Sequence, residues 1–181
     1  MNFLEMSPSE LYKYVKQEIK YGFVDTLGNK YYPNDFERAD IDKLYILQSP
    51  HDTLKNKCAW CWDVVELYRY YFNSNNIPNN TYYLEYKNDD SDIHQTHTFI
   101  LYSLNGKWYN IEDNSSNNEN GIFEYNSEID AINTISFYFK EYIKNTFNEV
   151  LSDEFYICNK YIKPSYHISS IEFQNWCKNT R

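Results

Sequence analysis

Residues 57–67 read KCAWCWDVVEL, and this stretch decides the fold. Apolar residues recur after Cys61 at helical spacing until a polar run and Pro78 end the pattern. The sequence therefore predicts a helix over residues 61–75 that begins at Cys61 and buries one face. Because a helix N-terminus favours the thiolate, which is the nucleophilic form of cysteine, this position indicates that Cys61 is a catalytic nucleophile.

The rest of the sequence predicts one α+β domain over residues 1–181. The expected strands are residues 81–87, 96–104 and 107–111, with an edge strand at 155–162. The other expected helices are residues 8–20, 50–55, 128–151 and 169–177. Residues 26–30 are typical of a turn and residues 114–121 of a polar loop, whereas residues 31–49 fit either a short helix or extended chain.

The dipeptide Asn105-Gly106 is a strong hairpin signal, and it decides which acid accompanies His97. In a two-residue loop Leu104 faces Lys107, and His97 and Glu112 are then diagonal neighbours on one face of the sheet. A three-residue loop would reverse the parity and bring Asp113 to that face instead. We favour Glu112 and keep Asp113 as the alternative acid.

Cys61, His97 and Glu112 form a candidate catalytic triad. His97 would accept the thiol proton and later donate it to the leaving group, while Glu112 would orient the imidazole. The backbone N–H of Cys61 would stabilise the oxyanion, and the indoles of Trp60 and Trp62 are candidates for a second donor or for walls of the cleft. The product is a thioester, which either water or an amine then attacks.

These features resemble the transglutaminase-like superfamily, in which a Cys precedes an acid by two positions, an apolar helix ends in Ile-Pro, and later strands carry a His and a Trp followed by an acid. The matching positions here are Cys61, Asp63, Ile77-Pro78, His97, Trp108 and Glu112. The chain is also similar to small, largely uncharacterised bacterial and phage proteins of that superfamily. That similarity lies in residues 20–25, 61–67, 97–99, 163–164 and 171–173.

The resemblance implies a papain-like α+β fold, in which the Cys-bearing helix packs on an antiparallel sheet and extra helices lie at the N- and C-terminal ends. It also implies a peptidase, amidase or transglutaminase-type enzyme that acts on a peptide, a protein or a small amide without a cofactor. Two positions depart from the usual pattern, since Ala59 replaces a common Gly and Glu112 replaces the usual Asp.

Two other interpretations compete with the triad. The first is a catalytically inactive binding module on the same fold. The second is a Cys2His2 zinc site formed by Cys58, Cys61, His94 and His97. We expect no metal, because residues 94 and 97 point to opposite faces of a regular strand.

Composition excludes several classes of protein. The formal net charge is -9 and no basic run occurs, which argues against a nucleic-acid partner. No apolar run approaches the roughly 18 residues of a membrane span. The N-terminal residues do not resemble a secretion signal, so we expect a cytoplasmic protein whose four cysteines are reduced. The oligomeric state is left open.

Overall fold

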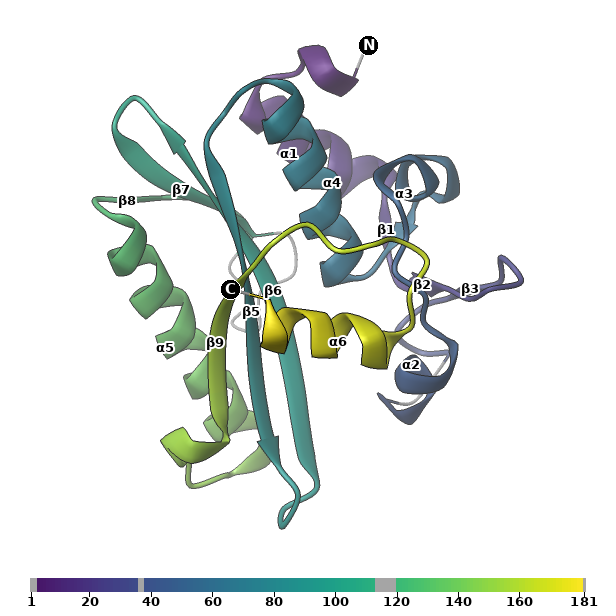
Figure 1. Cartoon of the computed structure of the whole chain (residues 1–181), viewed down its shortest axis with the longest axis vertical. Helices are drawn as coiled ribbons and strands as arrows, with labels where there is room; N and C mark the ends of the chain where they lie inside the picture. The colour runs from purple at the N-terminus through teal and green to yellow at the C-terminus, as the bar shows by residue number, and fades with distance from the viewer. Residues whose placement is uncertain (1–2, 36–37, 113–119, 181) are drawn as a thin grey trace.

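The computed structural model describes residues 3–35, 38–112 and 120–180. Within these residues the main sheet has five antiparallel strands in the order β8-β7-β6-β5-β9 (Figure 1). The strands are Asn79–Asn88 (β5), Ile93–Leu104 (β6), Lys107–Glu112 (β7), Gly121–Tyr125 (β8) and Tyr156–Tyr161 (β9). The architecture is therefore α+β, as the sequence predicts.

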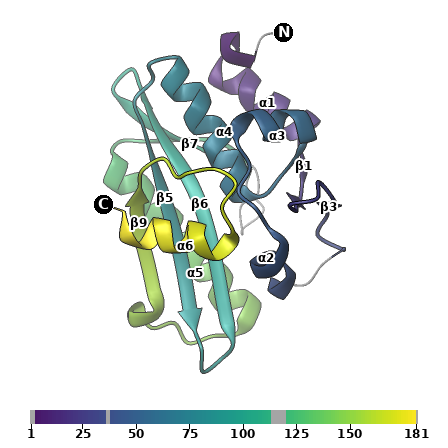
Figure 2. The same ribbon diagram turned by 45° about the vertical axis from the view of Figure 1, so that its right-hand side comes forward.

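Helices cover both faces of this sheet. Helix α4 (Cys61–Ser74) and helix α6 (Ser170–Asn179) lie on one face, and helix α5 (Glu128–Phe147) lies on the other (Figure 1). In the turned view, α6 crosses in front of the sheet and α5 lies behind it (Figure 2). A Cys-bearing helix thus packs on an antiparallel sheet.

Strand alternation divides the core between the two faces of the sheet. On the α4 face, Ile100 and Tyr102 of β6 join an apolar cluster that includes Phe72. On the α5 face, Phe99 and Leu101 join a second cluster with residues of α5. Side chains of β6 with odd numbers in this region therefore point toward α5, and those with even numbers point toward α4.

The N-terminal part of the chain packs along α4, from Phe3 beside Tyr71 near the end of this helix to the strand that directly precedes Cys61. Its elements are η1 (Phe3–Glu5), α1 (Pro8–Glu18), β1 (Lys20–Tyr21), β2 (Phe23–Val24), β3 (Lys30–Tyr31), α2 (Arg38–Leu44), α3 (Pro50–Asn56) and β4 (Cys58–Ala59). Strand β1 pairs in parallel with β4, with Tyr21 opposite Ala59. This pairing places Tyr21 beside the chain that leads into Cys61.

Gly22 makes this arrangement possible because its backbone lies very close to the neighbouring hairpin. A Cβ atom at position 22 would come 2.3 Å from the Tyr31 carbonyl oxygen and 3.2 Å from Cys58 Sγ. A side chain at this position would therefore clash with β3 and disturb the path of the chain next to Tyr21.

Most sequence-based boundaries agree with the structure, and the misses involve short elements. The predicted helix over 128–151 ends at Phe147, because Asn148 adopts a left-handed conformation with φ 52°. The predicted edge strand is confirmed as β9, which pairs with β5. Strand β8 was missed. Helix α2 is one of the two alternatives left open for residues 31–49, and the short helix η2 (Asp153–Phe155) leads into β9. Most of the expected loop 114–121 lies outside the described residues.

None of the described helices is long and apolar enough to cross a bilayer.

Candidate active site

Cys61 is the first residue of α4, and Asp63 fixes the backbone there. Asp63 Oδ2 accepts a hydrogen bond from the Trp60 N–H at 2.9 Å. Asp63 Oδ1 accepts two more, each at 2.8 Å, from the Tyr45 hydroxyl and the Gln48 N–H. Burial raises the pKa of Asp63 to about 6, although these hydrogen bonds favour the carboxylate. The fully buried Asp63 thus ties the start of α4 to the preceding chain.

The hairpin between β6 and β7 has the predicted register. Leu104 pairs with Lys107 and Leu101 pairs with Asn110, so the loop contains two residues. His97 and Glu112 consequently share a face, and His97 Nε2 lies 3.1 Å from Glu112 Oε2. The prediction that Glu112 is within reach of His97 is confirmed. The alternative acid, Asp113, lies outside the described residues.

The two strands part beyond Leu101 and Asn110, where β6 continues along β5 and β7 continues along β8. A pocket lies in this region and is lined from both faces of the sheet. By strand parity, Thr98 lies on the α4 face, whereas His97 lies on the α5 face, yet both line the same pocket. The Cys61 thiol and the His97 imidazole therefore meet where the sheet is no longer continuous.

His97 Nε2 contacts Glu112 Oε2, and the imidazole lines the pocket together with the Cys61 thiol. Its ring also stacks on Phe139 of α5, with the ring centres 6.5 Å apart. Burial lowers the pKa of His97, but the Glu112 charge and the interactions with Glu112 and Cys61 outweigh burial and raise it to about 10. The site therefore favours the imidazolium form.

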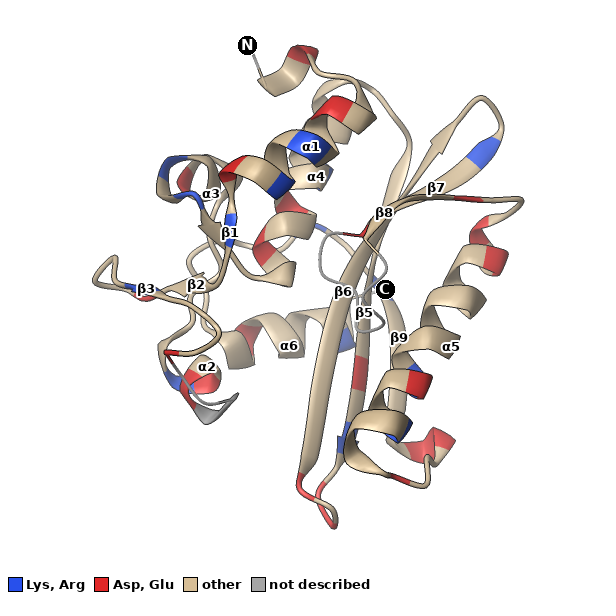
Figure 3. Ribbon diagram, turned by 180° about the vertical axis from the view of Figure 1, so that it is seen from behind, with Lys and Arg blue, Asp and Glu red and all other residues tan. Residues whose placement is uncertain are grey.

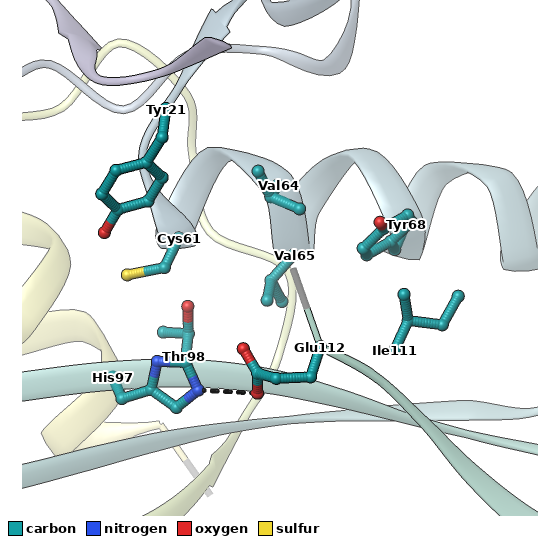
Figure 4. A pocket seen from close by; sticks show the side chains of 9 residues that line it. All are labelled: Tyr21, Cys61, Val64, Val65, Tyr68, His97, Thr98, Ile111 and Glu112. Atoms are coloured by element: carbon teal, nitrogen blue, oxygen red, sulfur yellow. Dashed lines mark hydrogen bonds and ion pairs between the residues drawn. The ribbon is translucent and has the colours of Figure 1, made fainter. Parts of the chain in front are cut away.

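The pocket around these residues is small, with a volume of about 30 Å³. That space holds one or two water-sized groups. Figure 4 shows Cys61 Sγ and the second ring nitrogen of His97 on the same side of this pocket, with the Tyr21 hydroxyl directed toward the sulfur. Thr98, which is 2% exposed, also lines the pocket, and its Oγ1 has no hydrogen-bond partner in the described structure.

The two tryptophans lie elsewhere than expected. Trp62 is buried in the core, where it packs on Tyr45 and Phe173. Trp60 stacks on Tyr21 at a ring distance of 4.5 Å. Neither indole is among the described residues that line the pocket. Tyr21 lines the pocket instead, and Trp60 packs against the Tyr21 ring.

The alternative zinc set is not brought together. Cys58 is buried, and its Sγ donates to the Phe23 carbonyl oxygen at 3.7 Å. His94 Nε2 lies 2.8 Å from Glu85 Oε1, away from Cys61. Within the described part of the chain, no group of three or more His, Cys, Asp or Glu side chains could hold a metal.

The other three thiols differ from Cys61 in their surroundings. Burial raises the pKa of Cys58 to about 11, and it also raises the pKa values of Cys158 and Cys177. Cys61 is partly exposed, and it alone of the four lines the pocket with His97. The sequence pattern therefore selected the one cysteine of the four that shares this pocket with an imidazole in the described structure.

No protein-family model matches this chain, and no curated protein has a significantly similar sequence. The functional assignment therefore depends on the chemistry of the pocket. That pocket joins a thiol at a helix N-terminus, a buried imidazole and a carboxylate, together with a buried hydroxyl that lacks a partner. This combination is suited to nucleophilic catalysis.

Proposed function

We propose that this protein is a thiol-dependent acyl-transfer enzyme with a papain-like, transglutaminase-like architecture. Its substrate is a peptide, a protein or a small amide, and Cys61, His97 and Glu112 perform the reaction. The observation that carries the proposal is the position of the His97 imidazole, which lines one pocket with the Cys61 thiol and contacts Glu112 at 3.1 Å.

The reaction begins from the thiolate–imidazolium pair, in which the Cys61 proton already resides on His97, and the sulfur attacks the substrate carbonyl carbon. The tetrahedral intermediate then collapses, the C–N bond breaks, and His97 returns the proton to the leaving amine. Cys61 is left as a thioester. Water or a second amine attacks this thioester, gives its proton to His97 and releases the thiol.

The environment of His97 supports this role. Its raised pKa favours the imidazolium, which is the partner that a thiolate needs. Glu112 orients the ring through the 3.1 Å contact and balances its positive charge. Packing on Phe139 fixes the ring plane and covers one face of the imidazole.

Two donors are suited to the oxyanion. The first N–H groups of a helix have no partner within that helix, so the Cys61 N–H is available for a substrate oxygen. The Tyr21 hydroxyl points toward the same side of the pocket as the sulfur and supplies the second donor (Figure 4). Thr98 Oγ1 is suited to a water molecule or a substrate polar atom, which would satisfy a hydroxyl that is otherwise buried without a partner.

The test is acylation by p-nitrophenyl acetate, followed by release of p-nitrophenolate and by peptide mass spectrometry. We expect a burst of one equivalent, with the acetyl group on Cys61. The burst should vanish in Cys61→Ala and persist in Cys158→Ala, since Cys158 is also partly exposed but does not line the pocket. Acetylation spread over several residues, or a normal burst in Cys61→Ala, would contradict the proposal and favour a binding module.

We also propose the cytoplasm as the location of the protein. All four cysteines are described, and all four are free. Unpaired thiols fit a reducing compartment. A catalytic thiol would also remain active there without a reductant.

A further inference from the structure

The pocket at Cys61 is too small to hold more than the reacting atoms of a substrate. Its volume of about 30 Å³ compares with about 430 Å³ for a neighbouring groove. Tyr21 and Val64 line both spaces, so the groove opens beside the pocket. We call it the Tyr21 groove, and define it by Val15, Lys20, Tyr21, Tyr32 and Val64. The bulk of a substrate that reacts at Cys61 has room there.

The walls of the Tyr21 groove combine apolar and aromatic surface with positive charge. Val15 and Val64 supply aliphatic surface, and Tyr21 and Tyr32 supply two rings. Lys20 Nζ lies 5.8 Å from the centre of the Tyr32 ring, which holds the ammonium group at the edge of this surface. An apolar group with a nearby negative charge would satisfy both features.

The charge of the groove contrasts with that of the whole chain. The described residues that line it include Lys16 and Lys20 but no Asp or Glu, whereas the chain has a net charge of -9. Figure 3 shows basic segments on α1 and at β1, beside acidic segments on α1. Glu18, the nearest acid in sequence, pairs with Lys57. Asp35 Oδ2 accepts a hydrogen bond from the Tyr32 N–H at 2.9 Å, so a carboxylate lies near this wall, but the charged side chains that line the groove itself are the two lysines.

We infer that the Tyr21 groove binds an aromatic or aliphatic side chain together with an adjacent carboxylate. The substrate class is thus an N-acylated apolar amino acid or a peptide that ends in one, with its free carboxylate near Lys20 and its amide at Cys61. This inference rests on the proposed function, because it places the reacting amide at the thiol. The groove's capacity to bind such a ligand can nevertheless be measured without any reaction.

The first experiment compares alkylation of Cys61 by N-iodoacetyl-phenylalanine, N-iodoacetyl-phenylalaninamide and iodoacetamide. We expect the carboxylate probe to react roughly 5- to 10-fold faster than its amide at low concentration, because it gains an ion pair with Lys20. Lys20→Gln should remove that preference. Lys13→Gln is the matched control, since Lys13 is an exposed lysine of α1 that is not among the described residues lining the groove. Equal rates for both phenylalanine probes, or equal loss in both lysine variants, would overturn the inference.

The second experiment measures binding of N-acetyl-phenylalanine and N-acetyl-phenylalaninamide to Cys61→Ala by calorimetry. We expect the acid to bind more tightly than the amide, and Lys20→Gln to abolish the difference. If Cys61 proves unreactive while this binding preference remains, the proposed function fails and the groove assignment stands. A reactive Cys61 with no binding preference would instead overturn the groove assignment.

Discussion

Strand β6 carries two histidines three positions apart, and each is paired with a glutamate. His97 Nε2 lies 3.1 Å from Glu112, and His94 Nε2 lies 2.8 Å from Glu85. The two pairs are equivalent if only the contact between imidazole and carboxylate is compared. They differ in the groups that surround them.

The pair of His97 and Glu112 faces a thiol, and the pair of His94 and Glu85 faces an ammonium group. Lys178 Nζ lies 2.8 Å from the same Glu85 oxygen that contacts His94. The His94 side chain is 25% exposed, whereas that of His97 is 11% exposed. The comparison teaches that a histidine and an acid become a candidate catalytic pair only where a nucleophile and a pocket join them; elsewhere they stabilise the fold.

The largest expected effect comes from replacing each histidine in turn. His97→Ala should slow the acetylation burst on the order of 10³-fold, because the thiol loses its proton acceptor. His94→Ala should leave the burst rate within about twofold, because His94 does not contact Cys61. Stopped-flow release of p-nitrophenolate measures both, and equal rate losses in the two variants would refute the distinction.

The next effect is the dependence of stability on pH. The folded-state pKa of His97 is raised, so its contribution to stability is present below the unfolded value of about 6.5 and is lost as the pH rises toward about 10. We expect a loss of roughly 2–4 kcal/mol over that window. Urea unfolding at a series of pH values should show a flatter profile for His97→Gln, and an unchanged profile would contradict the raised pKa.

Replacing the two acids should separate catalysis from stability. Glu112→Gln should reduce the burst rate roughly 10- to 100-fold, because His97 loses the charge that stabilises the imidazolium. Glu85→Gln should leave the burst rate unchanged but cost about 1–3 kcal/mol of unfolding free energy. The reason is that Lys178 and His94 share Glu85 as a buried partner, and the substitution removes its negative charge. A rate loss in Glu85→Gln that matches the loss in Glu112→Gln would contradict the distinction between a catalytic and a structural pair.

The smallest expected effect concerns the hydroxyl beside His97. Thr98→Val should slow the burst about 3- to 10-fold and leave stability the same or slightly higher, since Oγ1 has no partner to lose. Thr96→Val, on the same strand and the same face, is the control and should not affect the burst rate. A loss of stability in Thr98→Val without a rate change would assign Thr98 a purely structural role.

Local rules account for what the sequence predicted correctly. A two-residue hairpin fixes the register of its strands, so Asn105-Gly106 was enough to pair His97 with Glu112. Helical periodicity likewise placed Cys61 at the start of α4. These features depend on residues that are neighbours in the sequence.

Long-range contacts account for what the sequence could not predict. Tyr21 reaches the site through a two-residue parallel pairing between β1 and β4, which leaves no periodic signal. The close approach at Gly22, which accompanies this pairing, is visible only in the structure. Trp62 and Trp60 are adjacent to Cys61, yet the direction of each indole depends on partners such as Phe173 and Tyr21. Proximity in sequence was therefore a poor guide to the walls of the pocket.

The most direct test of the central claim is the pH dependence of iodoacetamide alkylation at all four cysteines, read by mass spectrometry on the native protein and on His97→Ala and His94→Ala. The account predicts that Cys61 is alkylated at pH 6 far faster than the other three cysteines. It also predicts that His97→Ala abolishes this advantage and His94→Ala preserves it. Slow alkylation of Cys61 that resembles an ordinary thiol, or an advantage that survives His97→Ala, would contradict it.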